Sequence, residues 1–335
     1  MIRLLLITIF LTAFLNDVIA QDSSSYANEA KILMNKGDFS NAILLLNKAI
    51  DKEPDNIVLK KDIGFCYYFQ NDYQSALSFL SPLIDSNVVD DDQCYQIAGD
   101  IFQRLNQPLE SEKIYKKGIS KFPESGALYN ELGVLLWEQG NEDAINYWEK
   151  GIETEPNYSK NYYNAANYYF FKNNWVWCII YGETFVNLES FSKKTPEVKA
   201  LLWKAVKQLY SNSKSVLNEM NRGRFTQNYI ENMFSDKNHT VESIHIDDLI
   251  MNRTKFVLSW FNNNSNNKFP FKLFEYHQEL LQKGLFEAYN EWLFGSSENL
   301  SAFQNWTQNH YNEYNDFISL QKSRIYKIAK DQYYH

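Results

Sequence analysis

The chain has 335 residues, of which 44% are hydrophobic, 22% charged and 16% aromatic, with only 12 Gly and 7 Pro. Such a composition is typical of folded proteins and excludes a disordered or collagen-like chain. The net charge of −8, from 33 basic and 41 acidic residues, repels phosphate backbones and argues against nucleic acid as the main partner. Beyond the N-terminal segment, no stretch is apolar for the roughly 18 residues that a membrane span needs, so we expect no span.

Residues 1–20 have the pattern of a secretory signal peptide. Arg3 is followed by an apolar run from Leu4 to Leu15 and then by Val18-Ile19-Ala20, which ends in a small residue. The run is too short to span a bilayer, so cleavage after Ala20 is favoured over anchoring, and a buried N-terminal helix is the alternative. The sequence therefore predicts a mature protein that begins at Gln21 and is exported to the periplasm or the extracellular space.

A repeat of about 34 residues covers the next part of the chain. Small residues recur at intervals of 34, 35, 34 and 33, and seven residues after each comes a turn that begins with Gly or Asn. Gly and Asn tolerate the left-handed conformation that ends a helix, and the apolar residues between these markers have helical spacing. Each unit is therefore predicted to be a helix hairpin, with the small residues where its helices cross. The small residues are Ala30, Gly64, Gly99, Gly133 and Ala166, and the turns begin at Gly37, Asn71, Asn106, Gly140 and Asn173.

The fourth unit carries the fullest set of repeat residues, namely Tyr129, Leu132, Gly133, Leu136, Ala144, Trp148 and Pro156. Proline also closes the first and third units, at Pro54 and Pro123, where it cannot continue a helix. In these features the chain resembles the tetratricopeptide repeat family. The resemblance covers about residues 23–192 and implies an all-α, right-handed α-solenoid of about five helix-hairpin repeats. We assign residues 21–192 to this solenoid.

The resemblance also implies which side chains would meet a partner, because the first helix of each unit lines a concave groove in this family. Some members grip peptide carboxylates with Lys and Asn at consecutive groove positions, and that clamp is absent here. Aromatic and amide contacts would instead hold an extended peptide or a helix. The alternative is that Trp137 and Phe170 are covered by the C-terminal helices. The expected peptide-binding residues are Lys61, Phe65, Tyr68, Gln103, Asn130, Trp137, Tyr163, Asn167 and Phe170.

Residues 193–335 are predicted to form a helical C-terminal region that caps the exposed end of the solenoid. Thr195-Pro196-Glu197 has the pattern of a helix start, with Thr as the cap. Further helices are predicted over residues 226–234, 248–261 and 271–294, with Asp247 and Asp248 as cap and first turn of the second. A loop is predicted at residues 262–267, and a final helix from near Ser301. The region resembles helical tails of secreted repeat proteins of Gram-negative bacteria, which imply no reaction.

Two groups of titratable residues are candidates for chemical sites, and neither has a suitable spacing. His239, Glu242 and His245 would spread over roughly 120° of a helix and do not converge on a metal ion. Glu287 and Glu291 lie four residues apart, where like charges indicate a solvated helix face. The sequence contains no G-x-S-x-G, H-E-x-x-H or glycine-rich phosphate loop. We therefore predict no metal site, no cofactor and no catalytic residue.

The three cysteines, Cys66, Cys94 and Cys178, are predicted to be free thiols of the core. Their number is odd and they lack C-x-x-C spacing. Cys66 and Cys94 lie on the first helices of adjacent units but seven residues out of step, or about 10 Å along the helix axis. A disulfide tolerates at most ~7 Å between Cα atoms.

We interpret the sequence as a non-catalytic scaffold that binds a peptide or protein in the concave groove of its repeats. One alternative is a structural subunit of an envelope or secretion assembly that uses its convex face and C-terminal region. Another is an enzyme in the C-terminal region, which would need a pocket with at least two converging titratable groups. An open aromatic groove would favour the scaffold, and a filled one would favour the assembly subunit.

Overall fold

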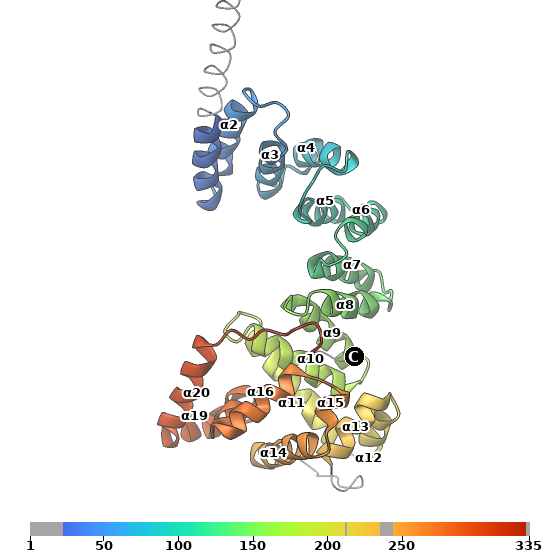
Figure 1. Ribbon diagram of the computed structural model, residues 1–335, viewed down its shortest axis with the longest axis vertical. Coiled ribbons are helices and arrows are strands. Elements are labelled where there is room, and N and C mark those ends of the chain that lie inside the picture. Colours follow the sequence, from blue (N-terminus) through green and yellow to red (C-terminus); the bar gives the residue numbers. More distant parts are fainter. Residues whose placement is uncertain (1–22, 212, 235–243, 333–335) are drawn as a thin grey trace, which may run out of the picture. The chain divides into compact units, whose positions relative to one another are not determined.

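The computed structural model describes residues 23–211, 213–234 and 244–332. The regular structure of these residues is entirely helical, which confirms the predicted all-α class. Contacts divide the chain into two compact units, Met1–Pro123 and Glu124–His335, which are described separately (Figure 1). The predicted signal peptide lies outside the described residues, as do His239 and Glu242.

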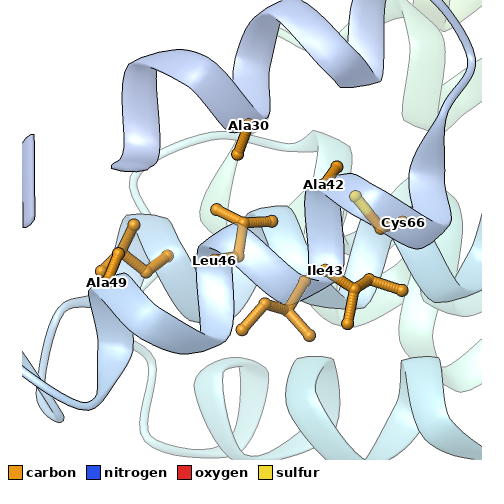
Figure 2. Close-up of a cluster of buried hydrophobic side chains, with 8 residues drawn as sticks. Ala30, Ala42, Ile43, Leu46, Ala49 and Cys66 are labelled. Atoms are coloured by element: carbon orange, nitrogen blue, oxygen red, sulfur yellow. The ribbon is translucent and has the colours of Figure 1, made fainter. Parts of the chain in front are cut away.

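The first unit contains three helix hairpins among its described residues. The helix of residues 23–35 packs on α2, α3 packs on α4, and α5 packs on α6. Figure 2 shows the buried cluster in which Ala30, Ala42 and Leu46 of the first hairpin lie together with Cys66 of α3. The helices are α2 (Phe39–Ile50), α3 (Ile57–Phe69), α4 (Tyr73–Asp85), α5 (Gln93–Arg104) and α6 (Pro108–Lys121).

The second unit begins with two further hairpins, so that the described residues hold the five predicted repeats. In this unit α7 packs on α8 and α9 packs on α10. Pro156 follows the end of α8, as the sequence predicted for a closing proline. The helices are α7 (Gly126–Glu138), α8 (Ala144–Thr154), α9 (Ser159–Phe171) and α10 (Trp175–Leu188).

The turns inside the five hairpins confirm the prediction from Gly and Asn. Every predicted turn residue has a positive φ, between 54° and 77°, which is the left-handed region. Four of the five second helices start directly after an Asp or Asn at the cap position, and three of these caps bond a backbone N–H of the first turn. The turn residues are Gly37, Asn71, Asn106, Gly140 and Asn173.

The small residues lie at the helix crossings, as predicted. A Cβ atom added to Gly64 would lie 2.7 Å from Leu80 Cδ2, on the second helix of the same hairpin. At Gly99 and Gly133 the same atom would overlap the rings of Tyr115 and Trp148. Only glycine lets these large buried side chains pack against the backbone of the first helix.

The rest of the second unit is a helical region after α10. It follows the repeats with helices α11 to α20 and returns to them at Ile328, whose N–H donates to Asn157 Oδ1 at 2.8 Å. The helices are α11 (Thr195–Tyr210), α12 (Ser213–Met220), α13 (Arg224–Met233), α14 (Ile246–Asn262), α15 (Ser265–Lys268), α16 (Lys272–Gln282), α17 (Phe286–Asn290), the π-helix η1 (Glu291–Gly295), α18 (Ser296–Glu298), α19 (Leu300–Asn309) and α20 (Tyr311–Ser323).

Several predicted boundaries in this region were wrong. The helix expected over residues 271–294 is divided, because Gly284 adopts a φ of +69° and ends α16, and a π-helical turn follows α17. The expected final helix breaks at His310, and the expected loop at residues 262–267 contains α15. Lys194 caps α11 in place of Thr195, and His245 caps α14, with Asp247 and Asp248 both in its first turn.

The compact units divide the chain after Pro123, whereas the repeat pattern ends near residue 192. The reason lies in α10, the second helix of the fifth repeat. Every residue of α10 from Trp175 to Asn187 is buried, because α9, α11 and α16 pack around it. The fourth and fifth repeats therefore share one core with the C-terminal region.

The three cysteines are free and buried, as predicted. Burial raises the pKa of Cys66 and Cys94 to about 12, so both remain thiols at neutral pH.

Candidate functional site

The nine predicted binding residues divide between the two compact units. In the first unit, Lys61, Phe65 and Tyr68 come from α3 and Gln103 from α5. Phe65 is buried, whereas the other three are partly exposed and have partners within the unit. Lys61 pairs with Asp91, and Gln103 Nε2 donates to Tyr115 Oη at 2.8 Å.

Tyr68 of α3 takes part in a hydrogen-bonded group with two residues of α5, Asp100 and Arg104. Its hydroxyl donates to Asp100 Oδ2 at 2.6 Å, and Arg104 Nε donates to the same oxygen at 2.6 Å. Burial, followed by the bond to Asp100, raises the pKa of Tyr68 to about 12. The Tyr68 hydroxyl is therefore a neutral donor that is bonded to Asp100.

In the second unit, Asn130 lies below the surface. Its side chain is buried, and its Oδ1 accepts a hydrogen bond from Asn164 Nδ2 at 2.8 Å. Its backbone oxygen accepts from Trp148 Nε1 at 3.3 Å. Asn130 of α7 thus forms hydrogen bonds to both α8 and α9, and these bonds hold the three helices together.

Tyr163 is engaged by the first C-terminal helix. Its hydroxyl donates to Glu197 Oε1 at 2.8 Å, and the Lys194 ammonium lies 4.9 Å from the centre of its ring. Asn167 donates to the Tyr163 backbone oxygen at 2.8 Å, and the Phe170 ring packs edge-on against Trp175. The C-terminal region therefore contacts one of the predicted binding residues directly.

Trp137 stands in a cluster of rings at the C-terminal ends of α7 and α9. Its ring meets Tyr168 at 5.3 Å and Phe171 at 5.5 Å between centroids, both edge-to-face, and Trp148 lies behind it at 6.3 Å. These partners come from the repeats. Trp137 and Tyr168 are half-buried, whereas Phe171 is 66% exposed. We call Trp137, Tyr168 and Phe171 the aromatic patch.

Sequence reasoning missed Tyr168 and Phe171 because it selected Phe170 by family position. The signal was available in the run Tyr168-Tyr169-Phe170-Phe171, where residues three apart share a helix face. A cation borders the patch, since the Lys172 ammonium lies 5.8 Å from the Tyr168 ring and 5.6 Å from the Phe171 ring. Lys172 also pairs with Glu142.

The densest group of titratable side chains lies elsewhere, in the core of the second unit. The Glu183 carboxylate of α10 receives hydrogen bonds from Arg253, from Tyr289 Oη at 2.7 Å and from His277 Nε2 at 2.8 Å. Burial alone would raise the pKa of Glu183, but the charge of Arg253 and the bond from His277 hold it well below its ordinary value. Burial lowers the pKa of His277, which is therefore a neutral donor.

The cavity beside this group is too small for a substrate. Its volume is about 10 Å³, with Glu183, Arg253 and His277 in its wall. That is roughly the space of one water molecule. The group fits a structural role, because each charge is paired and buried. No cluster of three metal-ligating side chains occurs among the described residues.

Glu291 departs from the expectation of a solvated surface. It is only 3% exposed, whereas Glu287 is exposed and accepts a hydrogen bond from Trp306 Nε1 at 3.0 Å. The π-helical turn that begins at Glu291 changes the register of the helix, so the two carboxylates have different surroundings. Within the described part of the chain, no helix is long and apolar enough to cross a membrane.

A family model described as tetratricopeptide repeat matches residues 33–97. No curated protein matches the sequence.

Several solved structures are similar in fold. One is a tetratricopeptide repeat protein from Parabacteroides merdae, 13% identical with a TM-score of 0.45, where the match covers 73% of this chain and 93% of that one. Another is PilW, titled a widely conserved type IV pilus biogenesis factor, with 18% identity, a TM-score of 0.44, and 60% and 91% coverage. MamA from Desulfovibrio magneticus has 15% identity, a TM-score of 0.41, and 50% and 94% coverage. Identities and scores this low carry no argument about function.

Proposed function

Taking the tetratricopeptide repeats of residues 33–97 as a premise, we propose that the chain is a non-catalytic scaffold that binds a peptide or protein. The aromatic patch of Trp137, Tyr168 and Phe171 is the observation that supports this most. Exposed aromatic side chains bury a large area at a small cost in conformational entropy, and they are frequent anchors of interfaces. Edge-to-face contacts hold the three rings in place before a partner arrives.

The patch suits a partner segment with an apolar side chain next to an acidic one. The apolar side chain would pack on Phe171 and Trp137. The acidic side chain would meet Lys172, which borders both Tyr168 and Phe171. Lys172 is already paired with Glu142 on the protein surface, so its contribution is to specificity more than to affinity.

Phe171→Ala is the sharpest test of this surface. Because Phe171 is mostly exposed, its loss should leave stability within about 0.5 kcal/mol while weakening the partner by tenfold or more. Trp137→Ala is less clean, since the ring packs against three others and its loss would also loosen the hairpin. Leu109→Ala is the matched control, because Leu109 is a similarly exposed apolar residue, 77% exposed on α6, and is not part of the aromatic patch.

The experiment compares the wild type, Phe171→Ala and Leu109→Ala as baits in an affinity capture from the compartment to which the protein is exported. The captured partner is then titrated against each protein. The scaffold proposal expects the Leu109→Ala protein to retain the partner and the Phe171→Ala protein to lose it. If both variants bind as the wild type does, the patch is not the binding surface. The convex face and the C-terminal region would then be the interface, as in an assembly subunit.

We also propose that the protein is exported by residues 1–20 and acts in the periplasm or outside the cell. The N-terminal sequence pattern supports this. The intact mass of the exported protein should correspond to a chain that begins at Gln21. Retention of residues 1–20 in that form would contradict the proposal.

A further inference from the structure

A pocket in the second unit lies apart from the aromatic patch and from the Glu183 group. Its volume is about 320 Å³, which is within the range of small-molecule sites. The wall comes from the segment after α10, the first half of α11, the π-helix η1 and the start of α18. It includes Phe191, Thr195, Lys199, Trp292 and Ser296. Phe191 is 55% exposed, so the pocket reaches the surface.

Lys199 supplies the only lining charge of this pocket. Its ammonium donates to the Trp292 backbone oxygen at 2.8 Å and lies 3.4 Å from the centre of the Trp292 ring. No carboxylate of the described residues pairs with it within 4.0 Å. Burial lowers the pKa of Lys199 to about 7, because the charged ammonium is poorly solvated there and the neutral amine is favoured.

Two carboxylates of neighbouring elements are engaged elsewhere. On α11, Glu197 accepts from Tyr163 and pairs with Lys194. On α18, Glu298 accepts from the Ile246 N–H and contacts His245.

A second cation, on α20, lies near the lining residue Phe191. The ammonium of Lys322 lies 5.9 Å from the ring of Phe191. On η1, Glu291 is buried, and burial with the nearby acids raises its pKa to about 7, so it carries little compensating charge below neutral pH. The charged side chains described beside the pocket are therefore mainly the two lysines, in a chain whose net charge is −8.

From this arrangement we propose that the pocket binds a small organic carboxylate, with its anionic group on Lys199 and its apolar body against Phe191 and Trp292. The carboxylate supplies the counter-charge that the pocket lacks. The exposed hydroxyl of Ser296, which makes no hydrogen bond to another described residue, is a second donor for it. The site is independent of the aromatic patch, so its failure would leave the scaffold proposal intact.

Above neutral pH, binding of the carboxylate should be accompanied by uptake of a proton by Lys199. A bound carboxylate stabilises the charged form of Lys199, so the ammonium is more stable in the complex than in the free protein. Above pH 7 the free protein must therefore gain a proton when the ligand binds. The affinity should weaken by up to about tenfold for each pH unit above 7, while the carboxylate itself stays ionised.

Benzoate is a suitable probe, because it joins a carboxylate to a ring that fits the pocket, and benzamide is its neutral counterpart. Calorimetric titration of the full chain at pH 7 should show one benzoate site with a millimolar or lower Kd, and binding of benzamide at least tenfold weaker. Lys199→Met should weaken benzoate by tenfold or more, and Lys199→Arg, which keeps the positive charge in a different shape, should weaken it less than Lys199→Met does. Lys204→Met is the matched control, since Lys204 is exposed on the same helix. This variant should bind benzoate as the wild type does.

Titrations in buffers of different ionisation enthalpy would measure the proton taken up at pH 8. This measurement uses the wild-type protein and keeps the proposal testable if Lys199→Met does not fold. Absence of benzoate binding, equal binding of benzamide, or binding without proton uptake would each overturn the proposal.

Discussion

Glu291 is a carboxyl group that the fold withdraws from water. Burial, followed by the charges of Asp247, Glu298 and Glu287, raises its pKa to about 7. In the unfolded chain the same group titrates near its ordinary value of about 4.3. Between these two values the folded protein holds a proton that the unfolded chain has released. The contribution of this group to the free energy of unfolding is therefore fully present below about pH 4 and is lost as the pH rises through 7.

Glu291→Gln should remove this pH dependence, because an amide has a similar size and does not titrate. We expect the wild type to lose up to about 3 kcal/mol of stability between pH 4.5 and 7.5 relative to the variant. Urea denaturation of both proteins at intervals across this range would measure the difference. Parallel curves for the two proteins would show that Glu291 ionises as freely in the fold as in the unfolded chain.

Single residues were predictable from sequence where one local rule decides their role. The turn residues needed only the left-handed tolerance of Gly and Asn, and Asn71, Asn106 and Asn173 all show it. The burial and raised pKa of Glu291 could not be predicted in this way. They depend on a π-helical turn and on acids that folding brings close, and the spacing of residues in the sequence shows neither.

At the scale of the element, three of the hairpins pack a glycine of one helix against a large side chain of the other. Gly133 of α7 faces Trp148 of α8, and Gly99 of α5 faces Tyr115 of α6. Both large rings are fully buried or nearly so. Because a close-packed ring cannot retreat, the pair sets how near the two helix axes come.

Gly133→Ala should destabilise the second unit by about 1–3 kcal/mol, since the new methyl group would overlap the Trp148 ring. Alanine has the higher helix propensity, which offsets part of the cost. Gly223→Ala is the control, because its Cβ would meet no atom within 4 Å and its φ of 167° is extended backbone. Thermal unfolding of the three proteins would measure the effects. A Gly133→Ala protein as stable as the control would mean that this crossing has room to relax.

The repeat hairpins could be predicted because their markers recur five times, so that errors at one unit are corrected by the others. The C-terminal helices recur nowhere, and their boundaries depended on weaker signals. Gly284 ends α16 inside an apolar pattern that reads as one continuous helix. The aromatic patch was found only in part, because Trp137 follows the family pattern whereas Phe171 does not.

At the scale of the second unit, α10 links the repeats to the C-terminal region. Its Glu183 is bonded by Arg253 of α14, His277 of α16 and Tyr289 of α17. Asn187, one turn further along α10, donates to the same Tyr289 hydroxyl at 2.8 Å. A buried carboxylate without these partners would cost several kcal/mol, so α10 requires helices that lie 70 to 106 residues later in the chain.

A chain cut after Ser192, where the repeat pattern ends, should therefore not keep its fifth repeat folded. The cut removes α11, α14 and α16 and exposes a helix whose residues from Trp175 to Asn187 are all buried in the whole protein. Amide hydrogens of α9 and α10 should exchange at least a hundredfold faster in this fragment than in the full chain, while those of α3 to α6 should keep most of their protection. Residues 21–123 are the matched control, because the first unit is compact by itself and should give a helical, cooperatively melting fragment. Native protection of α10 in the cut protein would show that the fifth repeat stands without the C-terminal region, and that the link through Glu183 is dispensable for folding.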